Sequence, residues 1–131
     1  MTENSQQIKR KDSRQLLNAL NVKSQYPIIK LSPTTGDVFA EKTLDLIEPV
    51  KIGRKLPPKC LPSPTNGLFD SKVLSRNHAE IFFQDGKVFI QDKGSSNGTF
   101  INSKRLSDEG IESSPFQIMS NDVLEFVLNN L

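Results

Sequence analysis

The sequence predicts an all-β sandwich of two mainly antiparallel sheets. Short apolar runs with strand-like alternation recur along the chain, and turn-forming residues separate them at intervals of roughly 8 to 12 residues. No segment shows a long helical period of apolar residues. The 131 residues fit one domain, and a hydrophobic content of 35% indicates one modest core surrounded by many loops.

The first expected strands are the apolar runs at residues 26–31, 38–47 and 50–54. A polar and charged segment precedes them. We therefore expect residues 1–22 to form a flexible N-terminal arm and residues 23–131 to form the folded domain.

A β-hairpin is the clearest local feature of the sequence. Asp85-Gly86 lies between two apolar runs and favours a two-residue type I′ turn, because both turn positions need a positive φ. This turn predicts the cross-strand pairs Phe83–Val88, Phe82–Phe89 and Ile81–Ile90. Strand pleating then predicts a core face made of Ile81, Phe83, Val88 and Ile90. The aromatic pair on the opposite face is interpreted as a structural cross-strand contact.

The later part of the chain is expected to form short strands at residues 99–102, 116–119 and 123–127, after an ordered segment that opens at Val73. The connection at residues 55–71 contains four of the eight prolines. Proline lacks a backbone donor, so this connection is predicted to contain no central strand. Loops of this length inside a compact domain are usually functional or disordered.

Composition excludes several classes of site. The chain has one cysteine, Cys60, and one histidine, His78, which excludes a disulfide framework, a multi-cysteine zinc site and a two-histidine metal site. No apolar run approaches the roughly 18 residues that span a bilayer. We therefore expect no metal, no cofactor and no membrane insertion by this chain.

Positive charge is concentrated in residues 51–76. This segment holds six lysines and arginines and one acid, Asp70, which gives it a charge of 6 − 1 = +5 against a total of +2. The remainder of the chain therefore carries 2 − 5 = −3. The segment favours an anionic partner, although a solvated basic loop explains the charge equally well.

Three short motifs occur in order between the expected strands. Ile52-Gly-Arg54 ends a strand, Leu-Ser-Arg-Asn-His-Ala follows at 74–79, and Asp-Lys-Gly-Ser-Ser-Asn-Gly-Thr-Phe-Ile-Asn follows at 92–102. Together they resemble the signature of the forkhead-associated (FHA) domain, over about residues 26–127. Each motif alone is weak, but the ordered set in a β-rich chain is highly specific.

Within the family, residues 69–79 and 95–106 are most similar to the FHA subfamily of sarcolemmal membrane-associated protein. The fungal relatives of that subfamily belong to factor-arrest and septation-inhibitory phosphatase complexes. The resemblance therefore implies an FHA-type sandwich that serves in a phosphatase–kinase signalling assembly.

The resemblance also implies a phosphothreonine-binding site on loops at one end of the sandwich. Arg54 matches the family arginine, whose planar guanidinium can donate two aligned hydrogen bonds to phosphate. Ser75 matches the serine whose hydroxyl donates to the phosphate, and Arg76 occupies the next contact position. Ser96 matches a position near the phosphate and the threonine methyl, and Asn97 matches the residue that bonds the peptide main chain.

The other signature residues are assigned to support of the binding loops. They are Gly53, His78, Gly98, Thr99 and Asn102. Gly98 permits a tight turn with positive φ. Since no cysteine or second histidine accompanies His78, a structural role fits it better than catalysis.

The sequence departs from the family pattern in two places. The family has Phe-Gly near its penultimate strand, whereas here Phe126 precedes Val127 and the sequence stops soon after, so the last strand is expected to be missing or altered. Some FHA domains use a basic residue two positions before the motif serine to select an acid three positions after phosphothreonine. Val73 stands at that position, so we expect no such selection and instead expect loop 55–71 to set the sequence preference.

The function implied is a non-enzymatic adaptor domain that recruits a phosphothreonine-containing partner, such as a kinase, to a phosphatase scaffold. We expect a cytoplasmic location, with a parent protein tethered to a membrane or placed at a spindle pole. One alternative is an anionic-surface binder that uses segment 51–76 on nucleic acid or acidic membrane. An enzyme using Ser75 and His78 is disfavoured, because the sequence offers no orienting acid or oxyanion element.

Overall fold

The computed structural model describes residues 25–34 and 39–126, and this part of the chain contains strands and loops but no helix. The strands are β1 (Ile28–Leu31), β2 (Lys42–Asp45), β3 (Val50–Arg54), β4 (Gly67–Phe69), β5 (Ala79–Gln84), β6 (Lys87–Asp92), β7 (Phe100–Ile101), β8 (Lys104–Arg105), β9 (Phe116–Gln117) and β10 (Leu124–Glu125). The predicted all-β fold is confirmed.

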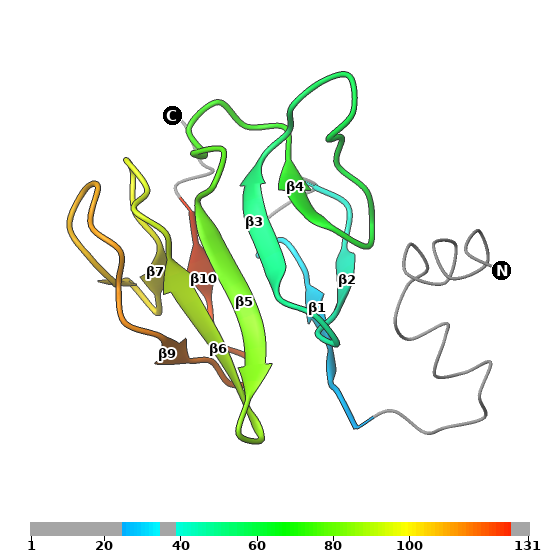
Figure 1. Cartoon of the computed structure of the whole chain (residues 1–131), viewed down its shortest axis with the longest axis vertical. Helices are drawn as coiled ribbons and strands as arrows, with labels where there is room; N and C mark the ends of the chain where they lie inside the picture. Colours follow the sequence, from blue (N-terminus) through cyan, green and yellow to red (C-terminus); the bar gives the residue numbers. More distant parts are fainter. Residues whose placement is uncertain (1–24, 35–38, 127–131) are drawn as a thin grey trace, which may run out of the picture.

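Two layers face each other across the core (Figure 1). One layer is a five-stranded sheet with the order β4-β3-β5-β6-β9, in which only the β3–β4 pair is parallel. The antiparallel pair β1–β2 and the three-stranded sheet β10-β7-β8 form the other layer. The hydrogen bonding thus divides the described strands into three sheets, which together build the sandwich.

The β5–β6 hairpin has the predicted register. Phe83 pairs with Val88, and the neighbouring pairs follow as expected along the whole length of both strands. Asp85 and Gly86 have φ values of 53° and 76°, as a type I′ turn requires. Phe82 and Phe89 stack on the outer face with their ring centroids 5.7 Å apart.

The core lies between the two layers and includes the predicted face of this hairpin. Ile81 and Ile90 are fully buried, and Phe83 and Val88 pack against the core at its edge. The other buried apolar residues come from β2 to β5 and from the segments that follow β2, β4, β8 and β10: Leu44, Leu46, Ile52, Phe69, Leu74, Ala79, Leu106 and Phe126.

Connection 55–71 holds a strand that the sequence interpretation did not place. Its prolines end at Pro64, and the following β4 pairs in parallel with β3 at the edge of the five-stranded sheet. Gly67 allows this pairing, because a Cβ there would lie 2.3 Å from the Lys51 carbonyl oxygen. The expectation of no central strand holds, since β4 is an edge strand.

Two predicted features fall outside the described residues. These are the N-terminal arm at residues 1–22 and the missing or altered last strand after Phe126. Phe126 itself is buried, and its ring meets those of Phe69 and His78 at centroid distances of 6.4 and 5.6 Å.

Candidate functional site

Three chain segments meet at one end of the sandwich, opposite the Asp85-Gly86 turn (Figure 1). They are the end of β3, the loop 70–78 that leads into β5, and the loop 93–99 that follows β6. Hydrogen bonds join each segment to at least one of the others.

The end of β3 is joined directly to the Ser75 loop. The Arg54 amide donates to the Ser75 carbonyl at 3.1 Å, and the His78 amide donates to the Ile52 carbonyl at 3.0 Å. A Cβ on Gly53 would lie 2.1 Å from the Arg76 carbonyl oxygen, so only glycine allows the two backbones to approach this closely. Arg54 and Ser75 are therefore neighbours, although 21 residues separate them in the sequence.

Loop 93–99 is joined to the Ser75 loop by two further hydrogen bonds. The Ser96 amide donates to the Ser75 hydroxyl oxygen at 3.2 Å, and Asn97 Nδ2 donates to the Val73 carbonyl at 2.8 Å. Ser75 accepts in the first of these bonds, which leaves its O–H hydrogen free to donate. The Asn97 carbonyl and its second N–H hydrogen are likewise left for another partner.

The buried side chain of His78 connects the Ser75 loop to loop 93–99. Its Nδ1 accepts a hydrogen bond from the Ser75 amide at 3.1 Å, so the proton sits on Nε2, which donates to the Gly98 carbonyl at 2.8 Å. The ring is fully buried. Burial lowers the pKa of His78, against the smaller raising effects of the Gly98 carbonyl and the Asp92 carboxylate. The imidazole is therefore neutral near pH 7 and fixed in one tautomer.

Asp92 organises loop 93–99, and the sequence interpretation did not assign it a role. Its carboxylate is 1% exposed and accepts hydrogen bonds from the amides of Gly94 and Ser95 and from the hydroxyls of Ser95 and Thr99. Burial opposes ionisation, but these hydrogen bonds outweigh it and lower the pKa of Asp92. An Asp followed by Gly and Ser residues is typical of side-chain-capped turns, and this was the signal available in the sequence.

The cations of the site differ in their surroundings. Arg54 is half-buried and Arg76 is exposed, and neither forms an ion pair with the described part of the chain. Lys55, the next cation along, is paired with Asp70 at 3.1 Å. Arg54 and Arg76 thus supply the uncompensated positive charge next to Ser75.

Arg105 was not predicted and lies close to the same loops. Its Nη2 is 3.5 Å from the Ser96 carbonyl oxygen, and its Nε donates to the Ser107 carbonyl at 2.7 Å. A Cβ on Gly98, whose φ is 96°, would lie 2.9 Å from Arg105 Nε. β8 has only two residues, so the sequence pattern did not indicate which way the Arg105 side chain points.

Asn102 is the predicted residue that the structure does not bring to the other loops. It lies in the turn between β7 and β8, where its side chain donates to Asp122 and accepts from the Val123 amide at 2.9 Å. It therefore joins that turn to the connection between β9 and β10.

Two kinds of feature do not occur in the part of the chain that the structure describes. Its histidine, cysteine and acidic side chains form no group of three that could hold a metal ion. No helix long and apolar enough to cross a bilayer is found there either.

Comparison with known proteins agrees with this geometry. The FHA domain profile matches residues 50–127, which carry all three loop segments. The chain belongs to the FHA family. FHA domains are phosphothreonine-binding modules, and Arg54, Ser75 and Asn97 all lie within the matched range.

Individual relatives extend the comparison. Human sarcolemmal membrane-associated protein is 51% identical over 90 residues, which are 67% of this chain and 11% of that protein. The Schizosaccharomyces pombe protein named "Uncharacterized protein C3H7.13" is 43% identical over 104 residues, 76% of this chain and 34% of the relative. The chain thus spans a small part of the length of these relatives.

A solved structure shares the fold at lower identity. Full-length yeast Pml1p superposes with a TM-score of 0.54 and 21% identity over 85% of this chain and 80% of that one. This likeness concerns the sandwich fold alone. The assignment of site residues rests on the geometry described above and on the FHA signature.

Proposed function

We propose that this domain binds a phosphothreonine-containing peptide through Arg54, Ser75 and Asn97. The observation that carries the proposal is the direct joining of Arg54 to Ser75, with a half-buried guanidinium that has no acid partner in the described residues. A phosphothreonine supplies about −1.5 to −2 charges at pH 7 and three strong acceptor oxygens. These are the chemical complements of a guanidinium and a free hydroxyl hydrogen.

The proposed contacts make binding depend on the phosphate. A charge-assisted hydrogen bond contributes roughly 1.5–3 kcal/mol, so two from Arg54 and one from Ser75 discriminate strongly against bare threonine. Arg76, which is exposed beside Ser75, adds a further cation. Because ordering of the peptide opposes these gains, we expect an affinity of order micromolar, or about −8 kcal/mol.

The remaining loop residues orient the peptide. Asn97 is held by Val73 and still has a carbonyl and an N–H for the peptide main chain. Ser96 is exposed next to Ser75, where it adjoins the proposed position of the threonine methyl. Burial of one methyl contributes about 1 kcal/mol, which sets the scale for preferring phosphothreonine over phosphoserine.

The arrangement of His78 supports a binding module rather than an enzyme. Both ring nitrogens are engaged by backbone groups, namely the Ser75 amide and the Gly98 carbonyl. Neither nitrogen is left to take a proton from the Ser75 hydroxyl, so that hydroxyl has no general base in His78. Gly53, Gly98 and Thr99 act with His78 as the support of the binding loops.

The parent protein's role is proposed by analogy with its relatives. As an adaptor, the domain would recruit a phosphorylated partner, such as a kinase, to a phosphatase scaffold in the cytoplasm, in a parent protein that associates with a membrane. The similarity to sarcolemmal membrane-associated protein over 90 residues supports this assignment.

Calorimetry with matched peptides tests the proposed function. We expect micromolar binding of a phosphothreonine peptide selected from a library, about fivefold weaker binding of the phosphoserine version and only residual binding, at least roughly 100-fold weaker, of the bare threonine peptide. Affinity should fall as pH drops below about 6, where the phosphate takes up a proton. Equal binding of phosphorylated and bare peptides, or tighter binding to duplex DNA or acidic vesicles than to any phosphopeptide, would reject the proposal.

A further inference from the structure

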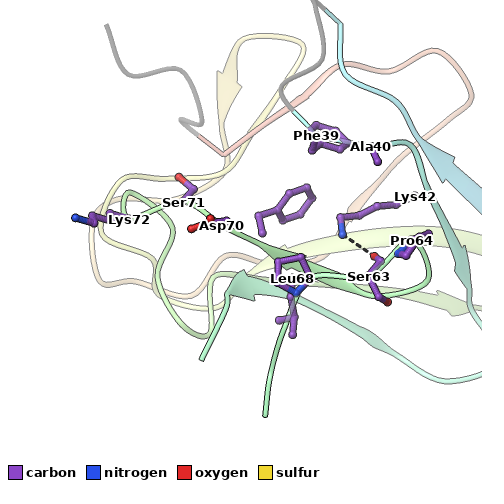
Figure 2. A pocket seen from close by; sticks show the side chains of 11 residues that line it. Phe39, Ala40, Lys42, Ser63, Pro64, Leu68, Asp70, Ser71 and Lys72 are labelled. Atoms are coloured by element: carbon purple, nitrogen blue, oxygen red, sulfur yellow. Dashed lines mark hydrogen bonds between the residues drawn. The ribbon is translucent and has the colours of Figure 1, made fainter. Parts of the chain in front are cut away.

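A pocket of about 540 Å³ opens beside the loops of the proposed phosphothreonine site (Figure 2). It lies between the start of β2 and residues 62–72, and its wall includes the apolar side chains of Phe39, Pro64, Leu68 and Phe69. Ser71 and Lys72 lie at the end of the pocket away from Lys42 (Figure 2). None of the residues matched by the FHA signature lines this pocket.

Lys42 is the unusual member of the pocket wall. The residue is 3% exposed, and its Nζ donates to the Ser63 carbonyl at 2.8 Å and lies 4.7 Å from the centroid of the Phe69 ring. Within residues 25–34 and 39–126, no carboxylate forms an ion pair with it. Buried ammonium groups are normally paired, and burial here lowers the pKa of Lys42. The side chain thus presents a charge that lacks an anionic partner in the described structure.

We propose that this pocket binds an acidic side chain, most simply a glutamate, from the same peptide that carries the phosphothreonine. The carboxylate would accept hydrogen bonds from the Lys42 ammonium, which has three N–H donors and uses one on Ser63. The methylene groups would pack against the apolar wall formed by Leu68 and Phe69. The proposal rests on the proposed function, because it assigns a second contact of the same ligand.

The position of the pocket along the chain supports a flanking residue of that peptide. The rim residues 70–72 continue without a break into Val73, which is joined to Asn97, and then into Ser75. Ser71 on the rim precedes Ser75 by four residues, so the chain keeps the two no more than about 14 Å apart. An extended peptide advances about 3.3 Å per residue, so about four residues of peptide cover that span.

The charges around the pocket favour an acid over a neutral group. Asp70 is an acid on its rim, and it is paired with Lys55 at 3.1 Å. Lys72, exposed on the same rim, adds a second positive charge. A neutral apolar side chain would pack against the apolar wall of the pocket but would leave the Lys42 ammonium without a counter-ion.

A glutamate scan of the phosphopeptide tests the proposal. Glutamate and glutamine are compared at each of about four positions on either side of the phosphothreonine. For the wild type we expect one position at which glutamate binds about tenfold more tightly than glutamine. In Lys42→Met the affinities for the glutamate and glutamine peptides should differ by no more than about twofold. The control Lys87→Met removes an exposed charge next to the Asp85-Gly86 turn and should retain the preference for glutamate.

A measurement on the wild-type protein keeps the proposal testable if Lys42→Met does not fold. The Lys42 side-chain pKa, followed by the ¹³Cε shift, should rise when the glutamate peptide binds and stay lower with the glutamine peptide. Two results would overturn the inference: a flat scan with phosphate dependence retained, or a preference that survives Lys42→Met. Loss of phosphate dependence itself would instead reject the proposed function.

Discussion

The two ends of the sandwich are both built from turns, but different side chains hold them. At the end with the Ser75 loop, the polar groups that join the turns are buried: His78 and Thr99 are fully buried and Asp92 is 1% exposed. At the opposite end, the Asp85-Gly86 turn is exposed and is shaped by its own backbone conformation.

The side chains that link turns at the two ends also differ in their exposure to water. Asn102 also links two turns at a sequence separation of 20 residues, but it is exposed to water. A buried polar group that loses its partner suffers the full cost of desolvation, whereas an exposed one exchanges its partner for water. The loops of the proposed site are therefore held in one arrangement by interactions that tolerate little change, and the far turns are not.

Of the substitutions that compare the two ends, replacement of Asp92 should have the largest effect on stability. In Asp92→Asn, an amide nitrogen would face the Ser95 and Thr99 hydroxyls, which now donate to the carboxylate. We expect a loss of roughly 2–3 kcal/mol in the free energy of unfolding, measured by urea denaturation. Asp122→Asn, at a partly exposed position in the other region, is the matched control and should change stability little. Similar losses in both variants would contradict the account.

A pH series sharpens the same comparison through His78. Burial holds its folded pKa below the ordinary 6.5, so the unfolded chain takes up the proton first as pH falls. The stability that the neutral ring contributes is complete above pH 6.5 and is lost as pH drops through the folded pKa. The corresponding loss for Asp92, whose pKa is also lowered, begins only below its ordinary value of 3.8.

Thermal unfolding between pH 8 and pH 5 checks this prediction. The wild type should lose stability only below about pH 6.5, and His78→Gln should be less stable by about 1–2 kcal/mol at pH 8 but less sensitive to pH. Gln retains a donor for the Gly98 carbonyl and loses the acceptor for the Ser75 amide. An unchanged pH dependence in this variant would show that His78 does not cause the loss.

The smallest effect is expected at the far end. Gly86 has a φ of 76° and nothing within 4 Å of an added Cβ, so Gly86→Ala meets only the cost of the left-handed backbone conformation. That cost is about 1 kcal/mol. Phosphopeptide affinity, measured by calorimetry, should be unchanged. A change of more than threefold would mean that the two ends are coupled.

Local signals made much of this fold predictable. Asp85-Gly86 fixed the hairpin register, because a two-residue turn leaves only one way to pair the flanking apolar runs. The three motifs similarly indicated the family before the strands were seen. Both signals depend on residues that lie close together in the sequence.

Features that depend on distant contacts were not predictable. β4 forms only because β3 supplies a partner across a proline-bearing connection, and its sequence Gly-Leu-Phe shows no alternation of apolar and polar residues. The burial of Lys42 likewise depends on Ser63 and Phe69, more than 20 residues away. The partners of Asn102, which are Asp122 and the Val123 amide, are also about 20 residues away, and the signature does not identify them.

The contact between Arg54 and the phosphate is the central claim, and a double-mutant cycle measures it directly. The two changes are Arg54→Ala in the protein and removal of the phosphate from the peptide, with affinities from calorimetry and folding verified by thermal unfolding. If Arg54 donates two charge-assisted hydrogen bonds to the phosphate, Arg54→Ala should weaken binding of the phosphopeptide about 100-fold and leave the residual binding of the bare peptide unchanged. A folded Arg54→Ala domain that binds the phosphopeptide as tightly as the wild type would contradict the account.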